Sequence, residues 1–178
     1  MDTDEQLHEE FYKLEFAVSR GIRYYTARAQ FWLTLLKTVE IMGLVLNAGA
    51  FAFLFRDEFI AGRVVVAISS FLSVVTLCFQ ATSRWELNIA QKRRFHELLE
   101  LFPVNKELES YELLKKIKDA RNSIEKDDDT LFKCLSVLCH NEECDARDMP
   151  EAKHPLTWIQ SHIGTIFPLK YSEKTVKK

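Results

Sequence analysis

Two long apolar runs joined by a short charged connection constrain this chain more than any other feature. The eighteen residues 64–81 include no charged side chain, and the eighteen residues 38–55 include only Glu40. At a helical rise of about 1.5 Å per residue, each run covers roughly 27 Å, close to the hydrocarbon thickness of a bilayer. The connection, residues 56–63, is short enough to hold two helices side by side. We therefore predict a transmembrane hairpin with spans at 38–55 and 64–81.

A buried hairpin in a soluble four-helix bundle is the alternative interpretation of the same runs. Helices that are apolar on all faces are typical of membranes or of the interior of large proteins, and a chain of 178 residues is short for such an interior. The averages conceal the runs, because the mean hydropathy is −0.13 and 28% of the residues are charged. The formal net charge of −2 gives no basic field, so we expect no direct nucleic-acid binding.

Polar, helix-forming segments flank the hairpin on both sides. Residues 1–37 contain few helix breakers, and we predict a helix there that leads directly into the first span. Residues 82–178 keep a helical period, with one apolar face that includes Leu87 and Phe95 and another that includes Ile117 and Ile124. The predicted fold is an all-α membrane protein with three parts: an N-terminal helix (1–37), a two-span hairpin (38–81) and a C-terminal cytoplasmic helical bundle (82–178).

Two finer predictions concern the C-terminal segment. The run Asp127 to Thr130 has the composition of a turn and helix N-cap, which would start a helix carrying Leu131, Leu135 and Leu138. The segment from Pro155 to Phe167 could form a last short helix against the bundle or the membrane surface.

Basic residues on both sides of the hairpin set its orientation. Cytoplasmic flanks of membrane spans are rich in lysine and arginine, whereas the predicted loop carries two arginines balanced by two acids. Both termini are therefore expected in the cytoplasm. The basic residues assigned to the membrane interface are Arg20, Arg23, Arg28, Lys37 and Arg84. They would either meet anionic lipid phosphates or only fix the topology.

Polar side chains inside the spans are the candidate functional residues. Ser69, Ser73, Thr76 and Gln80 follow i, i+4, i+7, i+11 spacing and would form one stripe on the second span. Such a stripe should not face lipid, so it would line a pore or hydrogen-bond to neighbouring helices, and both interpretations stay open.

The first span carries a second polar face. Glu40 and Asn47 are seven residues apart, and Lys37 lies one turn before Glu40. Glu40 would pair with Lys37 at the membrane boundary or serve in gating or ion coordination.

A cysteine and histidine cluster is the remaining candidate for chemistry. Cys134, Cys139, His140, Glu142 and Cys144 lack the paired spacing of zinc sites, so we expect no metal and predict buried, structural thiols. The sequence contains no phosphate-binding glycine loop and no nucleophile motif, and we expect neither an enzyme nor a cofactor. A membrane-bound hydrolase that uses this cluster is the least favoured of the functional hypotheses.

The order of these parts resembles one family. The motif Ser19-Arg20-x-x-Arg23-Tyr24-Tyr25-x-x-Arg28-x-x-Phe31 precedes the hairpin, and the string Leu138-Cys139-His140-Asn141-Glu142 follows it. Together they resemble the SLATT group of bacterial two-transmembrane proteins over roughly Phe16 to Asp145. The string is the most particular piece, because the hairpin and the basic aromatic motif are generic.

The resemblance implies a protein of a bacterial or prophage conflict system, such as an antiphage or abortive-infection system, in the inner membrane. It implies an oligomeric pore-forming or membrane-disrupting effector that a sensor protein or a nucleotide signal triggers through the cytoplasmic helices. The expected partners are thus the lipid bilayer, other copies of the chain, and that sensor or signal. We expect no sensor, nuclease or nucleotide-making domain within these 178 residues, in contrast to a complete defence system. A non-conducting scaffold that anchors a cytosolic partner is the alternative.

Overall fold

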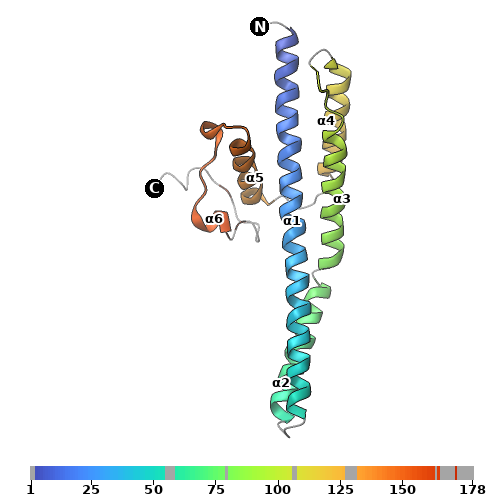
Figure 1. The fold of residues 1–178 in the computed structure, drawn as a ribbon, viewed down its shortest axis with the longest axis vertical. Coiled ribbons are helices and arrows are strands. Elements are labelled where there is room, and N and C mark those ends of the chain that lie inside the picture. Colours follow the sequence, from blue (N-terminus) through green and yellow to red (C-terminus); the bar gives the residue numbers. More distant parts are fainter. Residues whose placement is uncertain are drawn as a thin grey trace. The chain divides into compact units, whose positions relative to one another are not determined.

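The computed structural model describes residues 3–54, 59–78, 80–105, 108–126 and 132–162, together with Gly164 and Tyr171. Every regular element within these ranges is helical, which confirms the predicted all-α class for this part of the chain (Figure 1). The elements are α1 (Thr3–Leu54), α2 (Phe59–Cys78), α3 (Ala81–Leu99), α4 (Tyr111–Lys126), α5 (Lys133–Ala146), the 3-10 turn η2 (Pro150–Ala152) and α6 (Trp158–His162).

The first helix is long and uninterrupted. α1 runs for 52 residues, as expected for a segment without proline in which the three glycines are isolated. Of the helices in the described ranges, α1 alone is long and apolar enough to cross a membrane, with an eighteen-residue window of mean hydropathy 1.4. A shorter apolar stretch, Gly62–Val74, lies in α2. The predicted N-terminal helix that continues into an apolar segment is confirmed.

The boundaries of the second apolar helix differ from the prediction. α2 begins at Phe59, inside the predicted loop, because residues 59–63 contain no proline and the predicted boundary followed charge rather than helix propensity. It ends at Cys78, before the predicted limit of residue 81. Gln80 has a φ of 48°, a left-handed conformation that ends a helix. Residues 55–58 and Phe79 lie outside the described residues.

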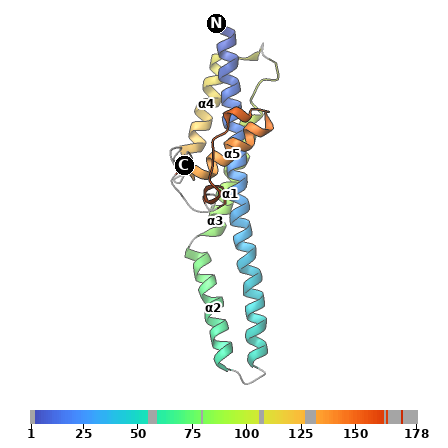
Figure 2. The same cartoon turned by 90° about the vertical axis from the view of Figure 1, so that its left-hand side faces the viewer.

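The chain divides into two compact units. Unit 2 comprises Arg28–Ile89, and unit 1 comprises residues 1–27 together with 90–178. The predicted divisions at residues 37 and 81 mark where a membrane should begin, whereas the units mark where the chain packs on itself. In unit 2, Figure 2 shows α2 running beside the C-terminal part of α1.

The core of unit 1 is built by four helices. α1 contributes Phe11, Leu14 and Val18, whereas α3, α4 and α5 contribute other buried apolar side chains. The buried cluster is Leu7, Phe11, Leu14, Val18, Tyr24, Tyr25, Phe95, Leu98, Ile117, Ile124, Leu135 and Cys139. The predicted face of α4 is confirmed by the burial of Ile117 and Ile124. Leu87 differs from the prediction, because it is 48% exposed while Phe95 is fully buried.

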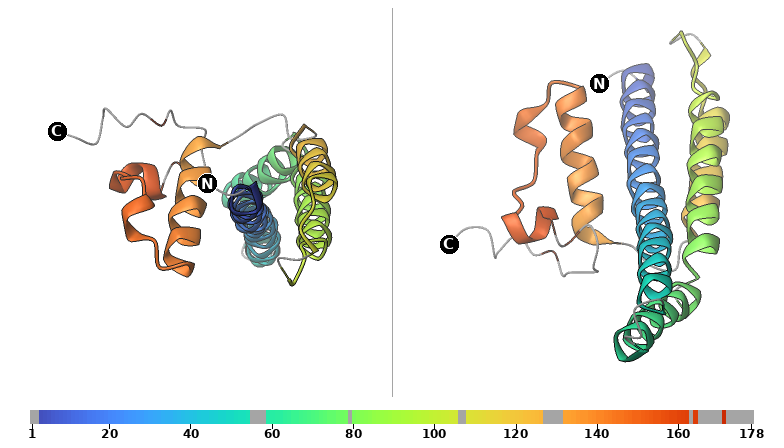
Figure 3. Two further views of the ribbon diagram at one scale, coloured as in Figure 1. Left: turned by 90° about the horizontal axis from the view of Figure 1, so that it is seen from above. Right: turned by 60° about the horizontal axis from the view of Figure 1, so that its bottom comes forward.

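The chain after α4 continues through α5, η2 and α6, which lie next to one another in unit 1 (Figure 3). The predicted N-cap run, Asp127 to Thr130, and Leu131 fall outside the described residues. The residue that precedes α5 is Phe132, and its side chain makes no capping hydrogen bond. Its backbone N–H donates to the Tyr24 hydroxyl at 3.0 Å, so a long-range hydrogen bond joins the residue before α5 to α1.

Candidate functional site

A cavity of about 760 Å³ in unit 2 brings the predicted polar faces together. Five of the six polar residues predicted within the spans line it, from α1, from α2 and from the junction before α3. These are Glu40, Asn47, Ser69, Ser73 and Gln80. The side chain of the sixth, Thr76, lies outside the described part of the chain. The other lining residues are Leu36, Val39, Gly43, Leu44, Ala81, Thr82 and Ser83.

Helical spacing explains how the lining is assembled. Leu36, Glu40, Gly43 and Asn47 recur every three or four residues on α1, so one face of that helix forms one wall. On α2, the Ser73 hydroxyl donates to the Ser69 carbonyl at 3.0 Å, which satisfies the hydroxyl within its own helix.

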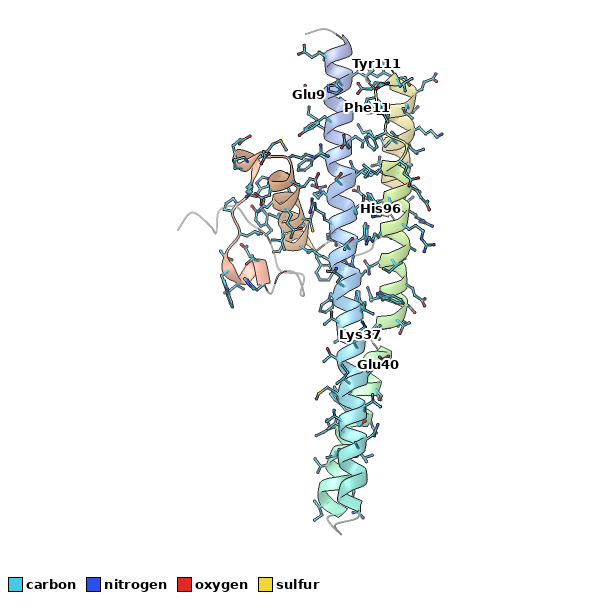
Figure 4. The ribbon with its side chains drawn as sticks, viewed as in Figure 1. Glu9, Phe11, Lys37, Glu40, His96 and Tyr111 are labelled. Carbon is cyan, nitrogen blue, oxygen red and sulfur yellow. The ribbon has the colours of Figure 1, made fainter. Side chains whose placement is uncertain are left out.

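Asn47 and Glu40 are two of the polar side chains on this cavity that lack a partner within the described ranges. Both are exposed, and within the described ranges neither makes a hydrogen bond or an ion pair. Lys37 and Glu40 form no ion pair, although the two lie one turn apart on α1 (Figure 4); the pairing is one of two interpretations of Glu40, and a gating or ion-coordinating role stays a prediction. A carboxylate and an amide without protein partners need hydrogen bonds from water or from another polar group. Covering this face of α1 with an apolar surface would therefore cost free energy.

Two residues of the lining are not among the predicted polar residues, and a third reaches the cavity by a different route from the predicted one. Thr82 and Ser83 follow the second apolar run directly, and that polar ending was the available signal. The predicted stripe places Gln80 on one continuous helix with Ser69, Ser73 and Thr76. The left-handed backbone of Gln80 removes it from the helical period of α2, yet the turn returns it to the same cavity.

The five basic residues assigned to the membrane interface have different surroundings. Arg23 donates from Nε to Glu143 Oε2 at 2.8 Å, and Arg28 is 7% exposed. The Arg84 guanidinium lies 5.9 Å from the centroid of the Trp32 ring, and Lys37 is exposed. Arg20 borders a separate cavity in unit 1. A role at the membrane interface remains a prediction for all five.

A buried carboxylate ties α5 to α1 within unit 1. Glu143 accepts from Arg23 Nε and from Arg147 Nε, both at 2.8 Å, and Arg147 also donates from Nη2 to Glu15 at 3.0 Å. Burial alone would raise the pKa of Glu143, but the hydrogen bonds from Arg23 and Arg147 outweigh burial and hold it below its usual value. The carboxylate is therefore charged at neutral pH, and the two arginines compensate its charge.

The Leu-Cys-His-Asn-Glu string serves structural contacts in unit 1. Cys139 is buried in the core, and burial, helped by Glu142, raises the pKa of its thiol to about 12. The Asn141 side chain donates to the His154 carbonyl at 2.7 Å and accepts from the His154 N–H at 2.8 Å. His140 Nε2 lies 3.0 Å from the Ala152 carbonyl, which can only accept, so this nitrogen carries the hydrogen.

These contacts fasten the segment after α5 onto α5 itself. The predicted burial of the thiols is confirmed for Cys134, Cys139 and Cys144, and burial raises the pKa of all three. A protonated, buried thiol is a poor nucleophile, so the arrangement does not favour the hydrolase reading. Within the described ranges, no group of three or more histidine, cysteine or acidic residues is placed to hold a metal ion.

Comparisons of the chain with protein-family models, with curated proteins and with solved structures give no match.

Proposed function

We propose that this chain is a membrane protein whose copies assemble around the cavity of unit 2 to form a conducting path. The observation that carries the proposal is the pair Asn47 and Glu40. Both lack protein partners within the described ranges, and both lie on a cavity of helices whose other exposed side chains are largely apolar. In lipid, such groups normally face a bundle interior or a water-filled space. The alternative occupant of this space is a neighbouring helix.

The exposed apolar surface of unit 2 supports the membrane part of the proposal. Leu44 on α1 is 73% exposed, and Ile60 and Phe71 on α2 are 80% and 67% exposed. Only 6% of the most apolar window of α1 is buried. Soluble monomeric proteins rarely expose so much apolar surface to water. In this proposal lipid and other copies of the chain cover it. In this proposal the second half of α1 and α2 are the two spans of a hairpin, and residues 82–178 form a cytoplasmic helical bundle.

Self-assembly follows from the same polar face. A single hairpin would expose Asn47 and Glu40 to lipid at considerable cost, whereas several hairpins with their cavities turned inward would give these groups water or one another. Oligomerisation is thus part of the proposal, and the bacterial inner membrane with cytoplasmic termini is the proposed location.

The resemblance to the SLATT group supplies the proposed biological setting. It supports a conflict-system effector that damages the inner membrane after a sensor protein or a nucleotide signal acts on the cytoplasmic helices. A non-conducting scaffold is the second candidate. The Ser73–Ser69 hydrogen bond favours it in one respect, because a hydroxyl satisfied within its own helix does not require a water-filled path.

Substitutions on the cavity separate a pore from a scaffold. We expect Asn47→Leu to make the path drier and narrower, so that single-channel conductance falls several-fold while the oligomer persists. Val45→Leu is the matched control, because Val45 is exposed on α1 and does not line the cavity. Conductance in planar bilayers and oligomeric state by native mass spectrometry are measured on the same preparations.

The other outcomes of this experiment are equally informative. If Asn47 only joins helices, Asn47→Leu should weaken the oligomer by about 0.5–2 kcal/mol per lost hydrogen bond. Glu40→Gln tests the acid in the same way and should change ion selectivity if Glu40 faces the path. Intact oligomers with unchanged conductance and selectivity in both variants would exclude these residues from a path and leave the scaffold.

A further inference from the structure

A second cavity lies inside unit 1 and has no part in the proposed pore. Its volume is about 290 Å³, near the lower end of small-molecule sites, and α1, α3, α4 and α5 all contribute to its lining. Tyr24, Tyr25 and Phe95 supply aromatic walls, and all three are buried. The polar lining consists of Arg20, Arg121, Glu125 and Ser136.

Arg20 is the unusual member of this lining. Its side chain is partly buried, and within the described ranges it makes no hydrogen bond and no ion pair at salt-bridge distance. Burial lowers the pKa of Arg20 from its usual value, Glu125 opposes that shift and Arg121 adds to it. A guanidinium remains charged even so, and its five N–H donors require water or another acceptor as a partner.

Arg121 and Glu125 compensate each other. Arg121 donates from Nε to Glu125 Oε1 at 3.1 Å and from Nη2 to Oε2 at 3.0 Å. This pairing uses two of the five donors of Arg121 and neutralises the single carboxylate of the cavity. The lining therefore keeps the positive charge of Arg20, the remaining donors of Arg121 and the hydroxyl of Ser136.

We propose that this cavity binds a small phosphate-bearing anion between Arg20 and Arg121. A phosphate group presents several acceptor oxygens in different directions, which suits donors that come from three side chains on three helices. The buried aromatic walls reduce the local dielectric and strengthen the attraction between a guanidinium and an anion. The proposal is independent of the pore, because every residue that carries it belongs to unit 1.

A stability titration tests the proposal on the full chain. The protein is placed in phosphatidylcholine nanodiscs, and inorganic phosphate is added at constant ionic strength with chloride as the balancing anion. A ligand that binds only the folded state raises the unfolding midpoint, so the midpoint of the wild type should rise with phosphate. Phosphorus NMR line broadening measures binding directly on the same samples. The same titration can be run in detergent or in buffer, so it does not require the chain to form a pore.

Arg20→Met is the decisive variant. Arg20 is partly buried and makes no hydrogen bond or salt bridge within the described ranges, so replacing it with an apolar side chain of similar length should largely preserve stability without phosphate. The affinity of the variant for phosphate should fall about tenfold or more, the usual effect of losing a charged hydrogen-bond donor. Arg93→Met, at an exposed arginine on α3 outside the cavity, should keep the wild-type response. Ser136→Ala should weaken phosphate binding a few-fold and serves as the milder variant if Arg20→Met does not fold.

A second arm identifies the source of the phosphate group. Nanodiscs with phosphatidylglycerol and no added phosphate present the group only as an anionic headgroup. A response to soluble phosphate assigns the site to a free anion, and a response to phosphatidylglycerol alone assigns it to a lipid, provided that Arg20→Met abolishes the response in each case. A wild type that responds in neither arm, or an Arg20→Met variant that responds like the wild type, overturns the proposal.

Discussion

Gly21 is a residue where the packing of unit 1 leaves no room for a side chain. A Cβ atom at this position would lie 2.5 Å from Cε1 of Phe95 and less than 3 Å from two further atoms of the same ring. Phe95 is fully buried, so its ring has little freedom to move away. The glycine therefore permits α1 and α3 to approach closely, at the usual cost in helix propensity.

We expect Gly21→Ala to destabilise unit 1 despite the better helix propensity of alanine. Overpacking costs about 1–3 kcal/mol, whereas the gain in propensity is about 1 kcal/mol or less. Gly43→Ala is the control, because a Cβ there meets nothing within 4 Å. Thermal unfolding followed by circular dichroism measures both. The double variant Gly21→Ala, Phe95→Leu should lose less stability than the two single variants lose in total, because the smaller side chain makes room for the new Cβ. Strictly additive losses would contradict the steric account.

At the scale of the element, α5 is held to α1 by charge as well as by apolar packing. Glu143 is 4% exposed and accepts from Arg23, which is 120 residues away in the sequence. Both arginines belong to this contact, so removing the carboxylate would leave two guanidinium groups facing each other in a partly buried site. The attachment of α5 should therefore depend on pH.

We expect unit 1 to lose stability in acid as Glu143 becomes protonated. Because its pKa is lowered on folding, its contribution is complete above the unfolded value of about 4.3 and is lost as the pH falls through the lower, folded value. Glu143→Gln should remove about 1–3 kcal/mol at neutral pH and flatten the acid dependence below about pH 4.3. The labelling rate of the buried thiols Cys139 and Cys144 reports the release of α5.

Glu142→Gln is the matched control for this experiment. Glu142 is the exposed neighbour of Glu143, and it makes no hydrogen bond to a residue in the described ranges. It should keep the wild-type stability and the wild-type acid dependence. An equal effect of both substitutions would show that general surface charge, and not the contact with Arg23 and Arg147, governs the pH response.

Local sequence patterns predicted the helices of this fold better than they predicted the contacts between the helices. The period of Ile117 and Ile124 and the absence of proline before residue 55 are properties of neighbouring residues, and they gave α4 and α1 correctly. The contact of Arg23 with Glu143 has no local signature, since side chains so far apart meet only through the fold. The left-handed Gln80 was missed for a related reason, because glutamine is not typical of that conformation.

At the scale of the whole molecule, the number of membrane crossings is the property that most needs a direct test. The described part of α1 is long and apolar enough to cross a bilayer, whereas the apolar stretch found in α2 is the shorter Gly62–Val74. The predicted topology has two crossings and places the beginning of α2 on the side opposite both termini. One crossing, two crossings and none give different labelling patterns for two exposed positions.

We expect Ile60→Cys to react with a membrane-impermeant maleimide in intact spheroplasts, and Val104→Cys to react only after permeabilisation. The two native side chains are 80% and 96% exposed, so accessibility within the protein does not limit either reaction. The background carries Cys78→Ala, and Cys134, Cys139 and Cys144 are buried. Labelling of both positions in intact spheroplasts would mean that α1 crosses alone and α2 does not return through the membrane. Labelling of neither, with the protein in the soluble fraction, would replace the hairpin with the soluble bundle that the apolar runs also permit.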